Sequence, residues 1–199
     1  QQAIQVMLDP ADCGPACISL SQDVQGEVFE YPEDFFKERV HVIRRPKPDD
    51  YQIKEAAELI KKSKKPLIIS GGGVFYSDAT DELSSFATKH NIPVTQTVMG
   101  YSTMKKDHSH YLGAIGGLGG RAANNLSKET DMAIAIGTKL ADFTTGSWTN
   151  FENPDFKLVS INAARFDANK HMAQAIVGDA KVSLIELSQA LGNWKADDN

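Results

Sequence analysis

The stretch from Lys65 to Gly73 constrains the fold more than any other part of the chain. A short apolar run at 66–69 leads through Ser70 into three consecutive glycines, and an amphipathic helical pattern follows. Glycine has no Cβ, so the backbone can turn sharply there and a ligand can approach the main chain. This pattern is typical of a parallel strand that ends at the carboxyl edge of an α/β sheet. The stretch predicts a dinucleotide-type domain but does not name a reaction.

Beyond residue 49, helical and strand-like patterns alternate. Apolar residues at 53, 56, 57 and 60 share one helix face, and further strand-like runs lie at 92–95, 131–137, 158–162 and 175–177. Ser77 or Asp78 is expected to cap the helix near 80–90, and Asp179 the last helix. Helical segments between apolar strands indicate parallel pairing through right-handed crossovers. We expect a three-layer αβα domain with a doubly wound parallel sheet of five or six strands over residues 50–192.

The remaining residues divide into three predicted segments. Residues 1–26 are interpreted as the C-terminal remnant of another domain, with a last strand at 16–20. Residues 27–49 are rich in proline and aromatic side chains, which predicts an extended linker. His41–Ile43 is a possible short strand within it. Residues 193–199 are interpreted as the start of a following linker.

Composition narrows the class of protein. The net charge of −5 and the absence of a basic stripe argue against nucleic-acid binding. No apolar run approaches the roughly 20 residues that a membrane span requires, and the first residues do not resemble a signal peptide. Cys13 and Cys17 are spaced neither as a redox pair nor as zinc ligands, so we expect buried or half-buried thiols in a reducing, cytoplasmic setting.

The polar and glycine residues that follow the predicted strands are the candidates for a ligand groove. Parallel strands bring their carboxyl ends to one edge, where nucleotides and related diphosphates bind. Seven residues form this candidate groove: Gly71, Gly72, Gly73, Gly137, Thr138, Lys139 and Asn162. The alternative is that tight turns simply require glycine. A complete dinucleotide fingerprint and a phosphate-binding Walker sequence are both absent, so a nicotinamide-dependent dehydrogenase is disfavoured.

No catalytic residue and no metal ligand is predicted. His108 and His110 lie in a polar loop, and His41, His90 and His171 have no cysteine or carboxylate at ligand spacing. The serines lack the glycine-flanked elbow of a hydrolase nucleophile. A sheet edge suited to a ligand, without a nucleophile and base, indicates part of a larger enzyme.

Three motifs in order resemble the thiamine-diphosphate enzymes of the acetolactate synthase and pyruvate decarboxylase superfamily. The sequence at 14–24, GPACISLSQDV, resembles the end of their pyrimidine-binding domain, with Ser21 in place of the usual proline. The runs KPLIISGGG at 65–73 and AIGTKLAD at 135–142 resemble the central domain, which implies a DHS-like NAD/FAD-binding fold. The sequences at 22–27 and 144–148 most resemble those of the superfamily branch that hydrolyses a cyclic 1,2-dione in inositol catabolism.

This resemblance implies thiamine diphosphate and Mg²⁺ in the parent enzyme, bound by flanking pyrimidine- and diphosphate-binding domains, and a homodimer or homotetramer. Gly178-Asp179-Ala180 lacks the second glycine of the Mg²⁺ motif, so Asp179 is interpreted as a helix cap. Some members bind FAD or ADP along the central sheet edge. The sequence at 160–163, SINA, lacks the two carboxylates that such members often carry, which favours an empty groove.

The fragment alone is therefore expected to be non-catalytic. Two alternatives stay open at this stage. One is a regulatory ADP- or FAD-binding domain of an acetolactate synthase-like enzyme. The other is an NAD-dependent deacylase of the sirtuin type, which would need four zinc-binding cysteines where this chain has two.

Overall fold

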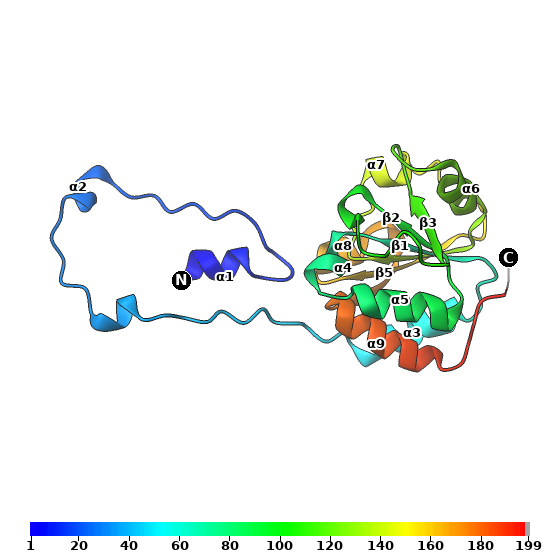
Figure 1. Ribbon diagram of the computed structural model, residues 1–199, viewed down its shortest axis with the longest axis horizontal. Helices are drawn as coiled ribbons and strands as arrows, with labels where there is room; N and C mark the ends of the chain where they lie inside the picture. Colours follow the sequence, from blue (N-terminus) through cyan, green and yellow to red (C-terminus); the bar gives the residue numbers. More distant parts are fainter. Residues whose placement is uncertain (198–199) are drawn as a thin grey trace. The chain divides into compact units, whose positions relative to one another are not determined.

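The computed structural model describes residues 1–197 and divides the chain into two compact units, Gln1–Arg44 and the residues from Arg45 onward. Figure 1 shows that the second unit holds the sheet and most of the helices. Among the described residues, no helix is long and apolar enough to cross a membrane.

The second unit is built on a parallel sheet of six strands. The strands are β1 (Pro66–Ser70), β2 (Val94–Gln96), β3 (Tyr111–Ala114), β4 (Met132–Ile136), β5 (Lys157–Asn162) and β6 (Gln174–Val177), in the spatial order β3-β2-β1-β4-β5-β6. All five neighbouring pairs are parallel. The predicted doubly wound sheet is confirmed.

Helices cover both faces of this sheet and complete the three layers. Figure 1 shows α3 (Asp50–Ile60), α5 (Thr80–His90) and α9 (Ala180–Leu191) together below the sheet, and α6 (Arg121–Glu129) and α7 (Asp142–Thr145) above it. The short α8 (Arg165–Ala168) joins β5 to the 3₁₀ turn η3 (Lys170–Met172) before β6.

The larger core lies between the sheet and the α3, α5 and α9 layer. Ile60, Leu83, Phe86 and Leu187 project into it and are at most 2% exposed. A smaller core on the other face includes Ile69, Ile115 and Leu140. Every residue of β1 and of β4 is buried, as expected for central strands covered on both faces.

The predicted cap of the last helix, Asp179, is confirmed, and Asp49 caps α3. The Asp49 carboxylate accepts from the Tyr51 N–H, and the Asp179 carboxylate accepts from the N–H groups of Lys181 at 3.0 Å and Val182 at 3.2 Å. These side chains satisfy amides that have no partner within the first helical turn.

The prediction that Ser77 or Asp78 caps α5 is wrong. A short helix, α4 (Gly72–Tyr76), begins directly in the glycine turn and ends at Ser77. Asp78 then adopts a positive φ of 53°, and α5 begins after Ala79 without a side-chain cap. The extra helical turn uses the residues that would otherwise have capped α5, which the apolar spacing alone does not reveal.

The second unit begins with a segment fixed to the turn between β6 and α9. The Arg45 guanidinium donates to the Ser77 carbonyl and, at 3.1 Å, to the Asp179 carboxylate. The Asp179 N–H donates to the Pro46 carbonyl at 2.8 Å. Asp179 therefore caps α9 and also holds the start of the unit.

The first unit consists of short elements joined by extended chain. Its elements are α1 (Gln2–Met7), α2 (Gln22–Gln25) and the 3₁₀ turn η1 (Glu33–Phe36). Aromatic residues of the predicted linker contact one another: the Tyr31 and Phe35 rings lie 5.0 Å apart, and both are mostly exposed.

Three expectations for this unit are wrong. Residues 16–20 and 41–43 form no strand, because a strand requires hydrogen-bonding neighbours and the described residues offer none to either segment. Cys13 and Cys17 are exposed rather than buried, since the segment that carries them packs against no core.

Candidate functional site

The order of the strands places a topological switch point at the carboxyl edge of the sheet. From β1 the chain moves outward to β2 and β3, and it then returns to β4 on the other side of β1. In open parallel sheets, ligands bind at the point where the connections that follow two neighbouring strands run to opposite sides of the sheet. The glycine turn after β1 and the loop after β4 lie at this switch point, and they contain six of the seven candidate residues.

The two loops at the switch point are in direct backbone contact. Gly71 N–H donates to the Ile136 carbonyl at 2.8 Å, and Gly73 N–H donates to the Gly137 carbonyl at 2.9 Å. A Cβ added to Gly73 would lie 2.6 Å from Gly137 Cα, and one added to Gly71 would lie 2.6 Å from Thr138 Cβ. Cβ atoms do not approach other atoms this closely, so glycine is required here by the contact between the loops.

The loop after β2 closes the edge further. It forms the 3₁₀ turn η2 (Val98–Gly100), and Thr97 N–H donates to the Ser70 carbonyl at 2.9 Å. A Cβ on Gly72 would lie 3.0 Å from the Met99 carbonyl oxygen, and one on Gly100 would overlap the Ser70 carbonyl. The loops after β1, β2 and β4 thus contact one another without side chains between them.

The remaining candidates follow β4 and β5. Asn162 donates from Nδ2 to the Thr138 carbonyl at 3.3 Å and accepts the Ala164 N–H at 3.0 Å, so both ends of its amide bond to backbone. Thr138 accepts the Leu140 N–H on its hydroxyl, and Lys139 is exposed. The Asn162 amide therefore joins the loops after β4 and β5.

A buried polar network lies beneath this edge and was not predicted from the sequence. The hydroxyl oxygens of Ser70 and Thr103 lie 2.8 Å apart, and Gln96 Nε2 donates to Thr103 Oγ1 at 3.1 Å. Thr103 Oγ1 donates to the Gly100 carbonyl at 2.8 Å. Ser70 and Gln96 end neighbouring strands, which was a usable signal, but Thr103 belongs to a loop that no periodic pattern identifies. The network ties that loop to the ends of β1 and β2.

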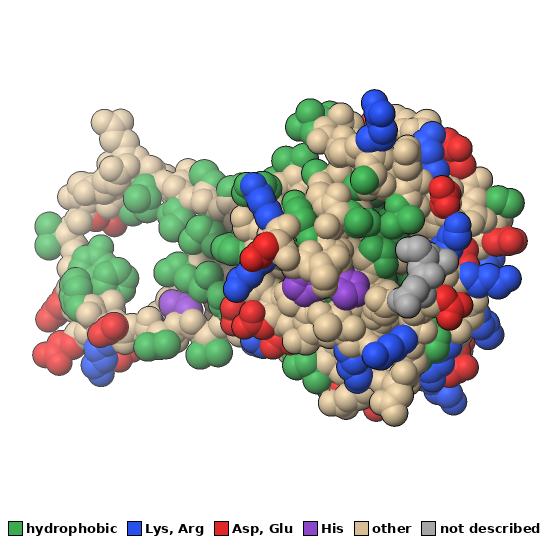
Figure 2. All heavy atoms as spheres, turned by 45° about the vertical axis from the view of Figure 1, so that its right-hand side comes forward, with side chains coloured by type: hydrophobic (Ala, Val, Ile, Leu, Met, Phe, Trp, Pro, Cys, Tyr) green, Lys and Arg blue, Asp and Glu red, His purple; other side chains and the backbone are tan. Residues whose placement is uncertain are grey.

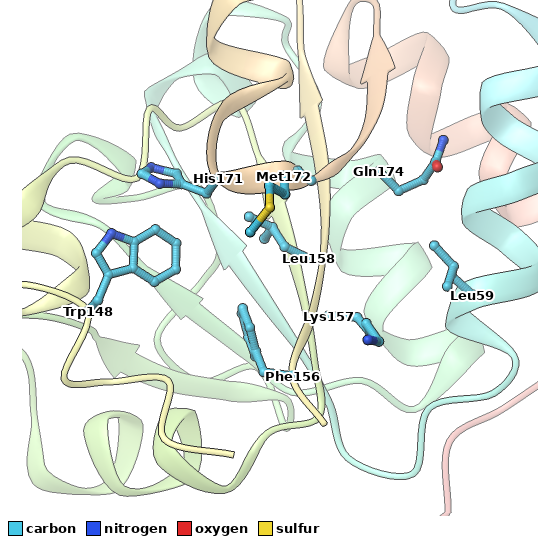
Figure 3. Close-up of a pocket in the computed structure, with 9 residues that line it drawn as sticks. Leu59, Trp148, Phe156, Lys157, Leu158, His171, Met172 and Gln174 are labelled. Atoms are coloured by element: carbon cyan, nitrogen blue, oxygen red, sulfur yellow. The ribbon is translucent and has the colours of Figure 1, made fainter. Parts of the chain in front are cut away.

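Two hollows lie away from the candidate residues. The larger, of about 590 Å³, is lined by Leu59, Trp148, Phe156, Lys157, Leu158, His171, Met172, Ala173 and Gln174, beside the first residues of β5 and β6. Figure 3 shows its apolar side chains, with Lys157 and Gln174 directed away from the centre. The smaller, of about 230 Å³, lies near Gln96 and Tyr101. Neither is lined by any of the seven candidates.

The histidines do not assemble a catalytic or metal centre. Burial lowers the pKa of His90, His110 and His171, so all three rings are neutral near neutral pH. His90 contacts the Ser188 hydroxyl, but it is fully buried and no substrate can reach it. Over residues 1–197, no group of three or more histidine, cysteine or acidic side chains could hold a metal ion.

Charge gives no further indication of a binding face. On the side of the molecule drawn in Figure 2, basic and acidic side chains are interspersed over the second unit. Several charged side chains of this unit form ion pairs at exposed positions, such as Lys128 with Glu152 at 2.7 Å. Pairs of this kind contribute little stability and produce no extended field of one sign.

Comparison with protein families identifies this arrangement. The family model for the central domain of thiamine pyrophosphate enzymes matches residues 53–187, the part of the chain that contains the sheet. The chain belongs to this family of central domains. The sirtuin-type alternative is thereby set aside, and the resemblance found in the motifs at 65–73 and 135–142 is confirmed.

Curated relatives match almost the whole chain. Proteins named 3D-(3,5/4)-trihydroxycyclohexane-1,2-dione hydrolase are 49% identical in Clostridium botulinum (strain Alaska E43 / Type E3) and 46% identical in Clostridium perfringens (strain 13 / Type A), each over 95% of this chain. The protein of that name in Bacillus subtilis (strain 168) is 44% identical over 98% of it. The chain spans only 29–31% of the length of these three relatives.

Solved structures support the fold. The benzoylformate decarboxylase of Polynucleobacter necessarius superposes with a TM-score of 0.68 at 22% identity, over 94% of this chain and 34% of the other. A putative thiamin diphosphate-dependent enzyme of Mycobacterium smegmatis gives a TM-score of 0.62 at 20% identity, over 78% and 30%. At these identities the likeness concerns the fold alone.

The described residues do not fit a thiamine diphosphate and Mg²⁺ site. Asp179, in the sequence that superficially resembles the Mg²⁺ motif, is 3% exposed. Its carboxylate already accepts from two backbone N–H groups and from Arg45. The interpretation of Asp179 as a helix cap is confirmed, and no step of cofactor chemistry is assigned to these residues.

Proposed function

We propose that this chain is a non-catalytic scaffold domain of a thiamine-diphosphate-dependent hydrolase that opens trihydroxycyclohexane-1,2-dione, a cyclic 1,2-dione of inositol catabolism. The names of the relatives at 44–49% identity support this substrate. Flanking pyrimidine- and diphosphate-binding domains would hold the cofactor and Mg²⁺, and the whole enzyme would be a homodimer or homotetramer. The coverage of about 30% of those relatives is consistent with further domains.

The contact between the loops after β1, β2 and β4 is the observation that carries the scaffold role. A nucleotide at this edge needs space for its diphosphate beside the glycines. Here Gly73 and Gly137 approach each other, and the Asn162 amide is bonded to backbone. We infer that the candidate groove of Gly71–Gly73, Gly137–Lys139 and Asn162 holds neither ADP nor FAD. The glycines maintain the packing of the edge.

Calorimetric titration of the chain with ADP, FAD and thiamine diphosphate plus Mg²⁺ tests the scaffold role. The expected result is no binding of any of the three. ADP or FAD binding that is lost in Asn162→Ala but kept in Asn169→Ala, a control at an exposed asparagine, would instead support the nucleotide-binding alternative. Thiamine diphosphate binding by this chain alone would contradict the proposed division of labour.

The substrate is tested with the complete enzyme that contains this domain. Loaded with thiamine diphosphate and Mg²⁺, it should hydrolyse trihydroxycyclohexane-1,2-dione and leave benzoylformate unchanged, and its mass in solution should correspond to a dimer or tetramer. Decarboxylation of benzoylformate with no action on the dione would refute the proposed substrate and leave the scaffold role intact.

A further inference from the structure

The segment that follows α9 folds back over the end of α5. Residues 192–197 leave α9 at Gly192, and Ala196 is only 8% exposed although it lies outside any helix or strand. Ala196 N–H donates to the His90 carbonyl at 2.9 Å, and Asn91 Nδ2 donates to the Ala196 carbonyl at 3.2 Å. We call residues 192–197 the exit segment.

The imidazole of His90 is the centre of this contact. His90 is the last residue of α5 and is fully buried. Its Nδ1 lies 2.7 Å from the Trp194 carbonyl oxygen, and its Nε2 lies 3.1 Å from Ser188 Oγ on α9. One ring therefore bonds both to the exit segment and to the helix that precedes it.

These partners fix the tautomer of the neutral ring. A carbonyl oxygen can only accept, so Nδ1 must carry the proton. Lys89 Nζ lies 3.0 Å from Ser188 Oγ and donates to it. The Ser188 hydroxyl, which accepts from Lys89, can donate its own hydrogen to an unprotonated Nε2. The closed contact thus accommodates the neutral ring with its proton on Nδ1.

We propose that His90 is a proton-operated latch, which holds the exit segment against α5 when the ring is neutral and releases it when the ring is protonated. A second proton would place an N–H on Nε2, facing a hydroxyl that already accepts from the Lys89 ammonium. The cation would then be buried beside Lys89 and near Lys195 of the exit segment. Opening the segment returns the ring to water, where its positive charge is solvated.

The pKa of His90 agrees in direction with this geometry. Burial is the largest cause that lowers this pKa, and the charges of Lys89 and Lys195 lower it further. The hydrogen bond to the Trp194 carbonyl acts in the opposite direction and raises it. The closed state therefore binds a proton less readily than the open state. Closure is most favourable above the ordinary histidine pKa of about 6.5 and is progressively lost as the pH falls below it.

Hydrogen exchange of the Ala196 amide measures the latch directly, because that amide bonds to the His90 carbonyl. In the 199-residue chain, its protection factor, corrected for intrinsic exchange, should fall by up to about tenfold between about pH 7.5 and pH 5.5. In His90→Gln, which retains an amide donor and acceptor but does not titrate, protection should not depend on pH in this range.

His110 supplies the control, because its Nε2 lies 3.1 Å from the Oδ1 of the same Asn91 that bonds to Ala196. The variant His110→Gln should keep the pH dependence. Loss of the dependence in His110→Gln, or its persistence in His90→Gln, would overturn the assignment. If His90→Gln does not fold, NMR titration of the unaltered chain decides: a His90 pKa at or above about 6.5 with Ala196 still protected would refute the latch.

Discussion

Replacing Gly137 with alanine should destabilise the second unit by about 2–5 kcal/mol. Gly137 has a φ of +59°, which a residue with a Cβ adopts at a penalty of about 1–2 kcal/mol. The new methyl group would also lie 2.5 Å from Gly73 Cα and 2.8 Å from Val74 N. These are backbone atoms that cannot rotate away, so overpacking adds about 1–3 kcal/mol.

Two matched variants separate these contributions. Gly146 has almost the same φ, +57°, but its nearest neighbour is the Thr149 hydroxyl, so Gly146→Ala reports mainly the backbone penalty of about 1–2 kcal/mol. Gly73 lies within α4 and faces Gly137, so Gly73→Ala reports mainly the steric overlap. Alanine has a higher helix propensity than glycine, and this difference offsets up to about 1 kcal/mol of the destabilisation caused by the overlap.

Urea unfolding followed by tryptophan fluorescence measures these differences, because Trp148 and Trp194 both belong to the second unit. With a slope of about 2 kcal/mol per molar urea, a loss of 3 kcal/mol moves the midpoint by about 1.5 M. If Gly137→Ala and Gly146→Ala agree within about 0.5 kcal/mol, the contact between the loops does not explain the glycine. Ligand approach would then again be the better explanation for the glycine-rich edge.

Three further outcomes are expected. Asp179→Ala should lower the unfolding free energy, measured by thermal melting, by about 1–3 kcal/mol, because it removes a helix cap and leaves Arg45 without its carboxylate partner. Asp179→Asn should lower the unfolding free energy by less, and equal losses in the two variants would contradict the capping role. Although burial acts to raise the pKa of Asp131, hydrogen bonds from Ser63 and from the N–H groups of residues 64 and 65 lower it overall. The contribution of the Asp131 carboxylate to stability is therefore complete above about pH 4 and is lost as the pH falls through the lowered pKa. In a plot of the urea midpoint against pH, Asp131→Asn should reduce the fall in the midpoint at acid pH. An unchanged fall would refute this role of Asp131. Thiamine diphosphate with Mg²⁺ should leave the melting temperature of the chain unchanged, and a rise that depends on cofactor concentration would contradict the absence of a site.

The central part of the fold could be predicted from the sequence because its signals are local. The runs at 67–69 and 132–136 are apolar at every position, and this identifies strands buried on both faces. The spacing of residues 53–60 and the position of Asp179 likewise define α3 and the start of α9. Strand β3 gave a weaker signal, since it is an edge strand of four half-buried residues with a glycine at positive φ.

The role of the sheet edge could not be predicted, because it depends on contacts between residues distant in the sequence. A glycine turn that admits a ligand and one that admits another loop have the same local pattern. What distinguishes them here is the approach of Gly73 to Gly137, 64 positions later, and of Gly100 to Ser70. The predicted cap of α5 was wrong for a related reason. Helix α4 starts inside the glycine turn, and apolar periodicity does not reveal the backbone geometry of that turn.

The contacts at the sheet edge and the contacts that hold the two ends of the second unit lie on different parts of the fold. At its beginning, Arg45 bonds to Ser77 before α5 and to Asp179 at the start of α9. At its end, His90 of α5 bonds to the exit segment and to Ser188 of α9. Both anchors thus lie on the two packed helices α5 and α9, at opposite ends, and neither includes a candidate edge residue. Substitutions at the edge glycines should therefore act on the packing between the edge loops, whereas substitutions at Arg45 or His90 should act on the bonds that hold the segments at the two ends of the unit.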